Sequence, residues 1–510
     1  MSEASPRELE LKLALDPAEV DHVRTSPLLR RLGRGRADER GLRSVYFDTA
    51  DHALRKAGIS VRIRTVDDAL VQTVKAQTAI RGGISNPVEV EFPVAEETPT
   101  IDAIPNKALR KQISRLVGDA DLKPVFETDM VRLKQDISRG HTLAELALDS
   151  GHIRTGEKDA PLNEAELELI AGSMDDFLAI ADDLFADVPL KFSNSSKAER
   201  GYSVATGEPA RPAVPVRAET APLYPDMSAA DAFRRITATA SDQILRNWAA
   251  FLSNDDPECI HQLRIGLRRQ RTALRVFRPR IDSDALRALA VDLRDAGRLV
   301  GEMRDKDVLI ADIVRPVLDR VPETKAGAGL LDRLTADCSA HRAHLRRELS
   351  SARWNSFLLR VALLPHGALW PDALPSLRVT SHAERALDAC WVKVRRRARR
   401  LEALQDAERH ELRKDLKTLR YTVEFFSPLY PPKLRDRFLE SLKVLQDSFG
   451  YLNDVVLSRT LPERLGEASE PDMHRVLGFV VGWHSALAEA EWADVTRRWR
   501  QLKHQKRFWT

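Results

Sequence analysis

Short segments in which charged and apolar residues alternate recur between residues 8 and 169, and they constrain the fold more than any other feature. The first is Glu8-Leu9-Glu10-Leu11-Lys12. Alternation with period two predicts a β-strand, because successive side chains of a strand point to opposite faces. One face of this strand carries Glu8, Glu10 and Lys12. That face either meets water or points into a closed, wet tunnel.

Seven later segments have a related pattern, so seven or eight strands are predicted: residues 43–49, 59–64, 71–75, 88–92, 131–133, 144–149 and 164–169. Charges of one sign are kept together on each strand, whereas an ordinary wet face would mix them. If these faces line a tunnel, its carboxylates could bind a hard divalent cation and its basic residues could bind phosphate oxygens. The apolar faces would then point outward, against helices such as residues 173–185.

The chain of 510 residues is too long for one core, so two or three domains are expected. Residues 1–220 hold 30 Lys+Arg and 37 Asp+Glu, a net charge of −7, and the remaining 50 and 39 give residues 221–510 a net of +11. The basic half indicates an anionic partner.

The start of the chain lacks the pattern of a secretion signal, and no apolar run approaches the roughly 20 residues of a membrane span. The cysteines Cys259, Cys338 and Cys390 are widely spaced, which argues against a disulfide framework or a CxxC metal site. These features predict a cytoplasmic protein without a membrane partner.

Five prolines between residues 203 and 225 exclude regular helix there and predict an extended connector. Beyond it, apolar residues recur at helical spacing. A shift of 149 residues aligns His261, Arg264, Arg268 and Arg271 with His410, Arg413, Lys417 and Arg420. The shift holds without gaps over about 48 positions, which predicts two copies of one helical unit.

In each copy these basic residues fall at i, i+3, i+7 and i+10, along one stripe of a helix, and Arg275 extends the first stripe. Stacked like charges repel, so an anionic ligand would offset the repulsion. A solvated face balanced by Asp305, Asp307, Asp447 and Asp454 is the alternative. The stripes carry almost no aromatic residues, which argues against nucleic acid and favours a ligand made of phosphate.

The first half resembles the CYTH domain, the triphosphate tunnel metalloenzyme fold. The resemblance rests on six motifs in order: Glu-x-Glu-x-Lys at Glu8, Tyr-Phe-Asp-Thr at Tyr46, Arg-x-Arg at Arg62, Glu-x-Glu at Glu89 and at Glu166, and residues 196–202. It implies an eight-stranded tunnel that hydrolyses inorganic triphosphate with Mg²⁺ or Mn²⁺.

The resemblance also implies roles for individual residues. Metal ligands would be Glu8, Glu10, Glu166 and Glu168, supported by Glu89 and Glu91, with Glu8, Glu10 and Lys12 as catalytic residues. The phosphates would be bound by Lys12, Arg62, Arg64, Lys75, Arg132 and Lys197. Residues 13–44 contain no Tyr to pair with Lys12, and Tyr46 is expected to be a packing residue.

The second half resembles the CHAD domain, a helical module that binds inorganic polyphosphate and is commonly fused behind CYTH domains. The implied polyphosphate-binding residues are His261, Arg264, Arg268, Arg271, Arg275, His410, Arg413, Lys414, Lys417 and Arg420. The first copy has Arg304 where the second has Asn453, so the two halves need not bind equally.

The sequence therefore predicts an α+β protein. An eight-stranded antiparallel β tunnel with flanking helices (1–204) is followed by a Pro/Ala-rich linker (205–225) and an all-α domain (226–510) of two repeated halves (about 226–370 and 375–500). The expected function is hydrolysis of inorganic triphosphate together with polyphosphate binding. Association with polyphosphate granules is part of that expectation. A polyphosphate receptor without turnover, a thiamine triphosphatase and an adenylate cyclase remain alternatives.

Overall fold

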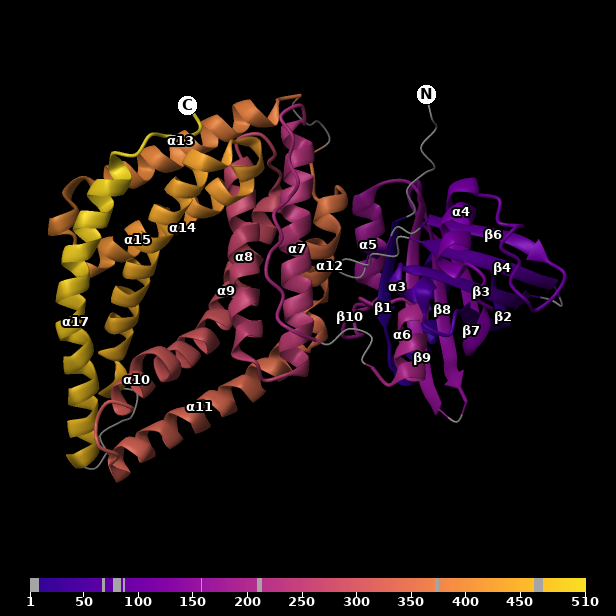
Figure 1. The fold of residues 1–510 in the computed structure, drawn as a ribbon, viewed down its shortest axis with the longest axis horizontal. Helices are drawn as coiled ribbons and strands as arrows, with labels where there is room; N and C mark the ends of the chain where they lie inside the picture. The colour runs from indigo at the N-terminus through magenta and orange to yellow at the C-terminus, as the bar shows by residue number, and fades with distance from the viewer. Residues whose placement is uncertain are drawn as a thin grey trace. The chain divides into compact units, whose positions relative to one another are not determined.

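The computed structural model describes residues 9–66, 69–76, 84–85, 88–156, 158–208, 213–371, 376–462 and 471–510. The chain forms two compact units. The first consists of Met1–Val214 with Ser350–Ala368, and the second consists of Pro215–Leu349 with Leu369–Thr510. Figure 1 traces most of the first unit from indigo to magenta, with α12 (Asn355–Leu363) in orange, and the second unit mainly from magenta to yellow.

One antiparallel sheet forms the centre of the first unit. Its order is β10-β1-β9-β8-β7-β2-β3-β4-β6, and β5 pairs with β1. The strands are β1 (Leu9–Ala14), β2 (Gly33–Asp48), β3 (Ile59–Val66), β4 (Ala69–Ala76), β5 (Ile84–Ser85), β6 (Val88–Val94), β7 (Lys123–Arg139), β8 (Thr142–Thr155), β9 (Lys158–Ala171) and β10 (Lys191–Phe192).

The sheet closes on itself through β1. One edge of this strand pairs with β9, and the other pairs with β10 and β5. Because β6, the last strand of the order, follows β5 along the chain, the β5–β1 pairing joins the two ends of the sheet. The eight predicted strands are present in the described residues, and the two additional strands, β5 and β10, are only two residues long each.

The outer face of the sheet is apolar and covered by helices, as predicted. On β3 and β4, Val61 and Val74 pack with Ile113 of α4 (Lys107–Val117) and Leu54 of α3 (Ala53–Lys56). The other helices of this unit are α1 (Pro17–Thr25), α2 (Pro27–Leu32), α5 (Met174–Leu184), α6 (Lys197–Thr206) and α12 (Asn355–Leu363), with short 3-10 turns at Ala352–Trp354 and Leu364–His366. Burial of the apolar face leaves the charged face for the tunnel interior.

Helix α12 belongs to the first unit, although it lies far along the chain. It packs against α5, and the buried side chain of Asn355 donates to the carbonyls of Phe185 (2.6 Å) and Val188 (2.9 Å). The Asn355 side-chain oxygen accepts a hydrogen bond from the Leu190 amide. The sequence analysis assigned this segment to the second domain.

The second unit is all-helical. Its helices are α7 (Ala229–Ser253), α8 (Pro257–Phe277), α9 (Asp284–Val308), α10 (Arg315–Leu318), α11 (Lys325–Leu349), α13 (Val379–Arg397), α14 (Asp406–Phe426), α15 (Pro432–Ser458) and α17 (Pro471–Lys503). A π-helical turn covers Leu309–Val314, and 3-10 turns cover Ala398–Ala403 and Ser427–Leu429. Helices α15 and α17 run side by side (Figure 1). The α+β class is confirmed.

The predicted repeat is visible in the helix bounds. Helix α14 begins and ends 149 residues after α8, and α15 lies within one residue of the same offset from α9. Equivalent positions also meet: the rings of Phe277 and Phe426 lie 5.9 Å apart, and Ser228 and Arg378, which precede α7 and α13, form a β-bridge. The two copies therefore pack against each other through equivalent helices.

The Pro-rich connector has no helix or strand between residues 213 and 225, whereas α6 extends to Thr206. The side chain of Asn247 on α7 exchanges two hydrogen bonds with the backbone of Val216 (2.8 and 2.9 Å), which fixes the end of the connector to the helical unit. No helix among the described residues is both long and apolar enough to cross a membrane.

Candidate functional site

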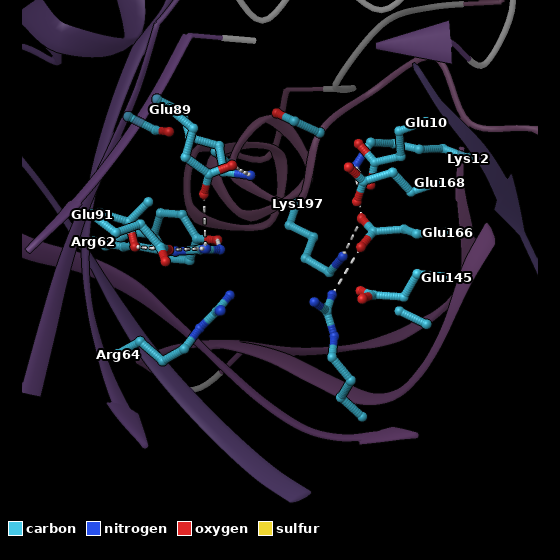
Figure 2. A pocket seen from close by; sticks show the side chains of 18 residues that line it. Glu10, Lys12, Arg62, Arg64, Glu89, Glu91, Glu145, Glu166, Glu168 and Lys197 are labelled. Atoms are coloured by element: carbon cyan, nitrogen blue, oxygen red, sulfur yellow. Dashed lines mark hydrogen bonds and ion pairs between the residues drawn. The ribbon is translucent and has the colours of Figure 1, made fainter. Parts of the chain in front are cut away.

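A cavity of about 460 Å³ occupies the tunnel, and charged side chains line it. Figure 2 shows two groups facing each other, one around Glu10, Glu166 and Glu168 and one around Arg62, Glu89 and Glu91. The lining includes every predicted tunnel residue that the structure describes: Glu10, Lys12, Arg62, Arg64, Lys75, Glu89, Glu91, Arg132, Glu166, Glu168 and Lys197. Glu8 lies outside the described residues.

Strand register explains the acidic wall. Glu10 on β1 pairs directly with Glu168 on β9, which pairs directly with Glu145 on β8. All three line the cavity, so three carboxylates stand in one row across neighbouring strands. Like charges in direct cross-strand positions repel, so such a row favours a cation at this wall. Glu145 was absent from the predicted site, although its strand was recognised as acidic.

Cations also lie within the acidic wall. The Lys12 ammonium is 3.0 Å from Glu10 and 2.6 Å from Glu166. Lys134 is 2.7 Å from Glu145. Each of these carboxylates is therefore at least partly neutralised by the chain itself.

The facing wall is built mainly from β3, β4 and β6. Lys75 is 2.7 Å from Glu89, and Arg62 lies 3.6 Å from Glu89 and 3.7 Å from Glu91. Arg64 instead bonds to the Ser44 hydroxyl at 3.2 Å. Burial, together with the charges of Arg62 and Arg132, lowers the pKa of Arg64 to about 10. Arg64 is thus a cavity arginine in an environment of surplus positive charge.

Tyr46 has two roles in this wall. Its ring stacks on Phe126 with the centroids 4.5 Å apart, as expected for a packing residue, but it also lines the cavity. Its hydroxyl accepts from Arg62 at 3.4 Å. Burial would raise the pKa of this hydroxyl, but Arg62, Arg64 and Lys197 outweigh burial and lower it. The packing prediction accounted only for the ring.

Helix α6 carries Lys197 into the tunnel. A capping box between Ser196 and Glu199 begins the helix at Lys197. The helix lies close to β7, so that Gly201 faces the Phe126 ring with no room for a Cβ. Tyr202 donates to the buried carboxylate of Asp48 at 2.6 Å.

Asp48 belongs to the Tyr-Phe-Asp-Thr motif and also accepts from the amides of Leu54 and Arg55. This motif therefore holds α3 and α6 in place.

Lys197 meets a compact group of three acids, Asp149, Glu164 and Glu166, whose oxygens lie within 4.8 Å of one another. The Lys197 ammonium is 2.8 Å from both Asp149 and Glu166, and it also pairs with Glu164. Arg132 binds both oxygens of Asp149 at 2.7 Å and also bonds to Glu166. Arg200 pairs with Glu164. Asp149, Glu164 and Arg200 were absent from the predicted site. Their closeness depends on the strand register, which the sequence motifs do not give.

This network sets the charges of its members. Burial would raise the pKa of Glu166, but Lys12, Lys197 and Arg132 hold it well below its usual value. Burial would lower the pKa of Lys197, but Asp149 and Glu166 raise it. Both groups are therefore ionised at neutral pH, and the paired charges stabilise each other.

The carboxylates present fit a hard divalent cation, since Mg²⁺ and Mn²⁺ favour oxygen ligands. Two groups qualify: the row of Glu10, Glu168 and Glu145, and the compact group at Asp149. The compact group already has Lys197, Arg132 and Arg200 bound to it. The row contains two of the predicted ligands, Glu10 and Glu168.

A second cavity, of about 890 Å³, lies in the helical unit where the two basic stripes meet. His261 and Arg268 line it from α8, and Arg413, Lys417 and Arg420 line it from α14. Arg217 and the neighbouring residues of the connector line it as well. The predicted repeat thus brings both copies to one cavity, and the connector contributes an additional cation that the sequence analysis did not select.

Six acids line this cavity beside five arginines and one lysine, but the basic residues crowd around Lys417 and His261. Burial, followed by the charges of Arg268, Arg413 and Arg264, lowers the pKa of Lys417 to about 5. Burial and Arg304 likewise lower the pKa of His261. A lysine with this pKa is neutral at pH 7, so bound anions would draw a proton onto it.

The remaining predicted stripe residues lie elsewhere or are paired. Arg264 pairs with Asp305 at 2.8 Å, Lys414 with Glu411 at 2.8 Å, and Arg275 bonds to Thr418. Arg271 is half-buried on α8, and burial lowers its pKa. His410 bonds to Asn453 at 3.0 Å and lines a separate pocket beside Trp492.

The four acids proposed to balance the basic stripes do not all support the same explanation, a solvated face or an anion-binding site. Asp305 pairs with Arg264 as the solvated-face alternative requires, whereas Asp307 pairs with Arg342. Asp447 and Asp454 line the cavity with the basic residues. Neutralisation by these acids is therefore partial.

The CYTH domain family matches residues 6–202, and the CHAD domain family matches residues 235–462. The chain consists of a CYTH domain followed by a CHAD domain. An inorganic triphosphatase from Haemophilus influenzae is 31% identical over 198 residues, which cover 38% of this chain and 54% of that protein. The match thus spans about half the length of this relative and falls on the CYTH side.

An uncharacterized protein from Mycobacterium tuberculosis is 25% identical over 447 residues, covering 82% of this chain and 81% of that protein. Among solved structures, the CHAD domain from the plant Ricinus communis matches with a TM-score of 0.48 and 26% identity, covering 57% of this chain and 98% of that one.

Proposed function

We propose that the CYTH domain hydrolyses inorganic triphosphate to pyrophosphate and phosphate with a divalent metal, and that the CHAD domain binds polyphosphate. The tunnel proposal is carried by one observation: a row of three carboxylates faces a wall that carries Arg62, Arg64 and Lys75 inside one cavity. The inorganic triphosphatase from Haemophilus influenzae supports the choice of reaction.

In this proposal, the facing walls divide the work. Arg62 and Arg64 bind phosphate oxygens with their planar guanidinium groups, and Lys75 adds a point charge. Lys12, beside Glu10 and Glu166, lies where the substrate meets the acidic wall and stabilises charge on the oxygen that leaves. Arg132 and Lys197 orient the carboxylates at Asp149.

Glu10, Glu168 and Glu145 would hold the metal, with Glu166 beside them. A bound Mg²⁺ or Mn²⁺ neutralises phosphate charge and acidifies water. The chain's arginines hold the triphosphate so that water attacks the terminal phosphorus, the bond to the bridging oxygen breaks, and pyrophosphate leaves. Among the described lining residues Tyr46 is the one aromatic. One face of its ring stacks on Phe126 and the side chain is buried, so it is poorly placed to stack on an adenine or thiamine ring.

The test is phosphate release from inorganic triphosphate, ATP and thiamine triphosphate, with Mg²⁺, Mn²⁺ or a chelator. We expect inorganic triphosphate to be hydrolysed fastest and the chelator to stop the reaction. Preference for an organic triphosphate would favour a different reaction of the same tunnel. Tight triphosphate binding without turnover would make the tunnel a receptor. The ion pairs that Lys12 and Lys197 form with Glu166 favour this alternative, because they occupy a carboxylate predicted to bind the metal.

Polyphosphate binding by the CHAD domain is proposed from the cavity between α8 and α14. Burial and the cations that crowd there from both copies lower the pKa of Lys417 and of Arg413, and a bound polyanion would relieve this crowding. Substituting Arg268→Gln with Arg413→Gln should weaken polyphosphate binding and flatten its salt dependence, because fewer counterions are released. An unchanged salt slope would rule out this cavity as the site.

A further inference from the structure

A second basic pocket lies in the helical unit, away from the two stripes. It has a volume of about 780 Å³ and lies between the end of α13, the following 3-10 turn and the last turns of α17. Six cations line it: Arg395, Arg396, Arg399, Arg400, Arg500 and Lys503. None of them lines the cavity between α8 and α14.

Acidic partners are scarce here. Glu402 is the one acid lining the pocket within the described residues, and it pairs with Arg500 at 2.8 Å. In that part of the chain, no ion pair or side-chain hydrogen bond is found for Arg395, Arg396, Arg399 or Arg400, and all four are exposed.

The other face of α13 is a contrast within the same helix. Lys393 and Arg397, which face α14, both reach the buried carboxylate of Asp415 at 2.7 Å. Cations on the packed side of this helix thus have a partner, whereas those on the pocket side have none in the described chain.

The helix terminus explains only part of this cluster. Cations in the last turn of a helix are stabilised by its dipole, and Arg395 and Arg396 lie in the last turn of α13. Arg399 and Arg400 lie beyond the helix, and Arg400 has non-helical backbone angles (φ −120°, ψ 53°). The mutual repulsion of these arginines is offset if an anion binds between them.

The lining also indicates the kind of anion. Trp499, the one aromatic among the described lining residues, is only 7% exposed, so no ring face is available for base stacking. Guanidinium groups suit the closely spaced oxygens of phosphate groups. A ligand made only of phosphate therefore fits better than nucleic acid.

We propose that the pocket between α13 and α17 is a second polyphosphate subsite, separate from the cavity between α8 and α14. The choice of ligand rests on the proposed polyphosphate binding by this domain. Because the two sites share no lining residue, each can be removed without the other.

The test uses the full-length chain and long-chain polyphosphate. The pocket variant is Arg396→Gln/Arg400→Gln, and the cavity variant is Arg268→Gln/Lys417→Met. A matched control is Arg385→Gln/Lys433→Gln, which removes the same charge from exposed positions outside both sites. Equal thermal unfolding midpoints of pocket variant and control establish that folding is retained.

We expect the pocket substitutions to weaken binding about tenfold in the cavity-variant background, as loss of charge-assisted hydrogen bonds implies. Binding equal to that of the control in both backgrounds overturns the subsite. Equal affinity of the pocket for single-stranded RNA, lost in the pocket variant, overturns the assignment to polyphosphate. If instead the cavity variant alone binds like the native chain, the proposed cavity site fails, whatever the result for the pocket.

Discussion

Basic residues line both the tunnel and the helical cavity, but the surroundings of their lysines differ. In the tunnel, Lys12, Lys75 and Lys197 each lie within 3.0 Å of a carboxylate. In the helical cavity, Lys417 lies among arginines, and its pKa falls to about 5. Paired charges can be held in fixed geometry before substrate arrives, which suits catalysis, whereas a lysine crowded by arginines is relieved when a polyanion binds beside it.

The largest effect should come from removing a paired charge in the tunnel. Lys197→Met leaves Asp149, Glu164 and Glu166 without their shared ammonium, so we expect the first unit to lose about 3–5 kcal/mol of stability. The measurement is hydrogen exchange at β8 and β9, because a chain of two units need not unfold in one step. Unchanged exchange would contradict the account of this network.

The next largest effect should be a pH dependence of polyphosphate binding in the helical cavity. Free Lys417 has a pKa of about 5, and a bound polyanion raises it, so binding takes up a proton between the two values. Polyphosphate affinity should therefore fall as pH rises, by up to about tenfold per pH unit for one linked proton. Titration calorimetry in buffers of different ionisation enthalpy measures the uptake. Lys417→Met should remove it, whereas Lys433→Met, at an exposed position, should not.

Arg64 offers a smaller test. Burial and neighbouring cations lower its pKa, as they do for Lys417 in the helical cavity, whereas the tunnel lysines are paired with carboxylates. Arg64→Met removes an arginine whose pKa is lowered to about 10 by burial and neighbouring cations. We expect KM for triphosphate to rise about tenfold with little change in stability, since a phosphate contact is lost and no ion pair among the described residues is broken. Steady-state kinetics and thermal unfolding test both parts, and a loss of stability like that of Lys197→Met would contradict the contrast.

The smallest effect should come from Lys417→Met without ligand. Because the pKa of about 5 leaves this lysine neutral at pH 7, its replacement removes no charge and should change stability by less than about 1 kcal/mol. Hydrogen exchange at α14 measures this change in stability, which is compared with the change that Lys197→Met causes at β8 and β9. Marked destabilisation would mean that Lys417 is paired and charged in the free protein.

Periodicity was enough to predict six of the strands and the repeated helices, whereas the two longest strands, β2 and β7, were predicted only in part, at residues 43–49 and 131–133. The alternating pattern marks β1, β3, β4, β6, β8 and β9, and the offset of 149 residues relates α8 to α14. Strands β5 and β10 were missed because two residues are too short to show a period. Docking of α12 on the first unit was missed because its hydrogen bonds join residues far apart in the sequence: Asn355 donates to the carbonyls of Phe185 and Val188, and Ser356 donates to Asp182.

The site could be predicted only as far as the motifs reach. Glu10, Arg62 and Glu168 belong to motifs that were recognised, and all three line the cavity. Asp149 and Glu164 were missed because their closeness depends on the register of β8 and β9, where they pair directly. The connector residue Arg217 was missed because an extended segment carries no signal of which cavity it borders.

The most direct test of the central claim is phosphate release from inorganic triphosphate by the native chain and by Glu10→Gln/Glu168→Gln. Glu96→Gln/Glu97→Gln, at exposed positions outside the cavity, is the matched control. If the acidic row holds the metal, the row variant should lose on the order of a hundredfold or more in kcat while the control keeps its activity. Equal kcat values in the row variant, the control and the native chain would show that the row is not the catalytic metal site.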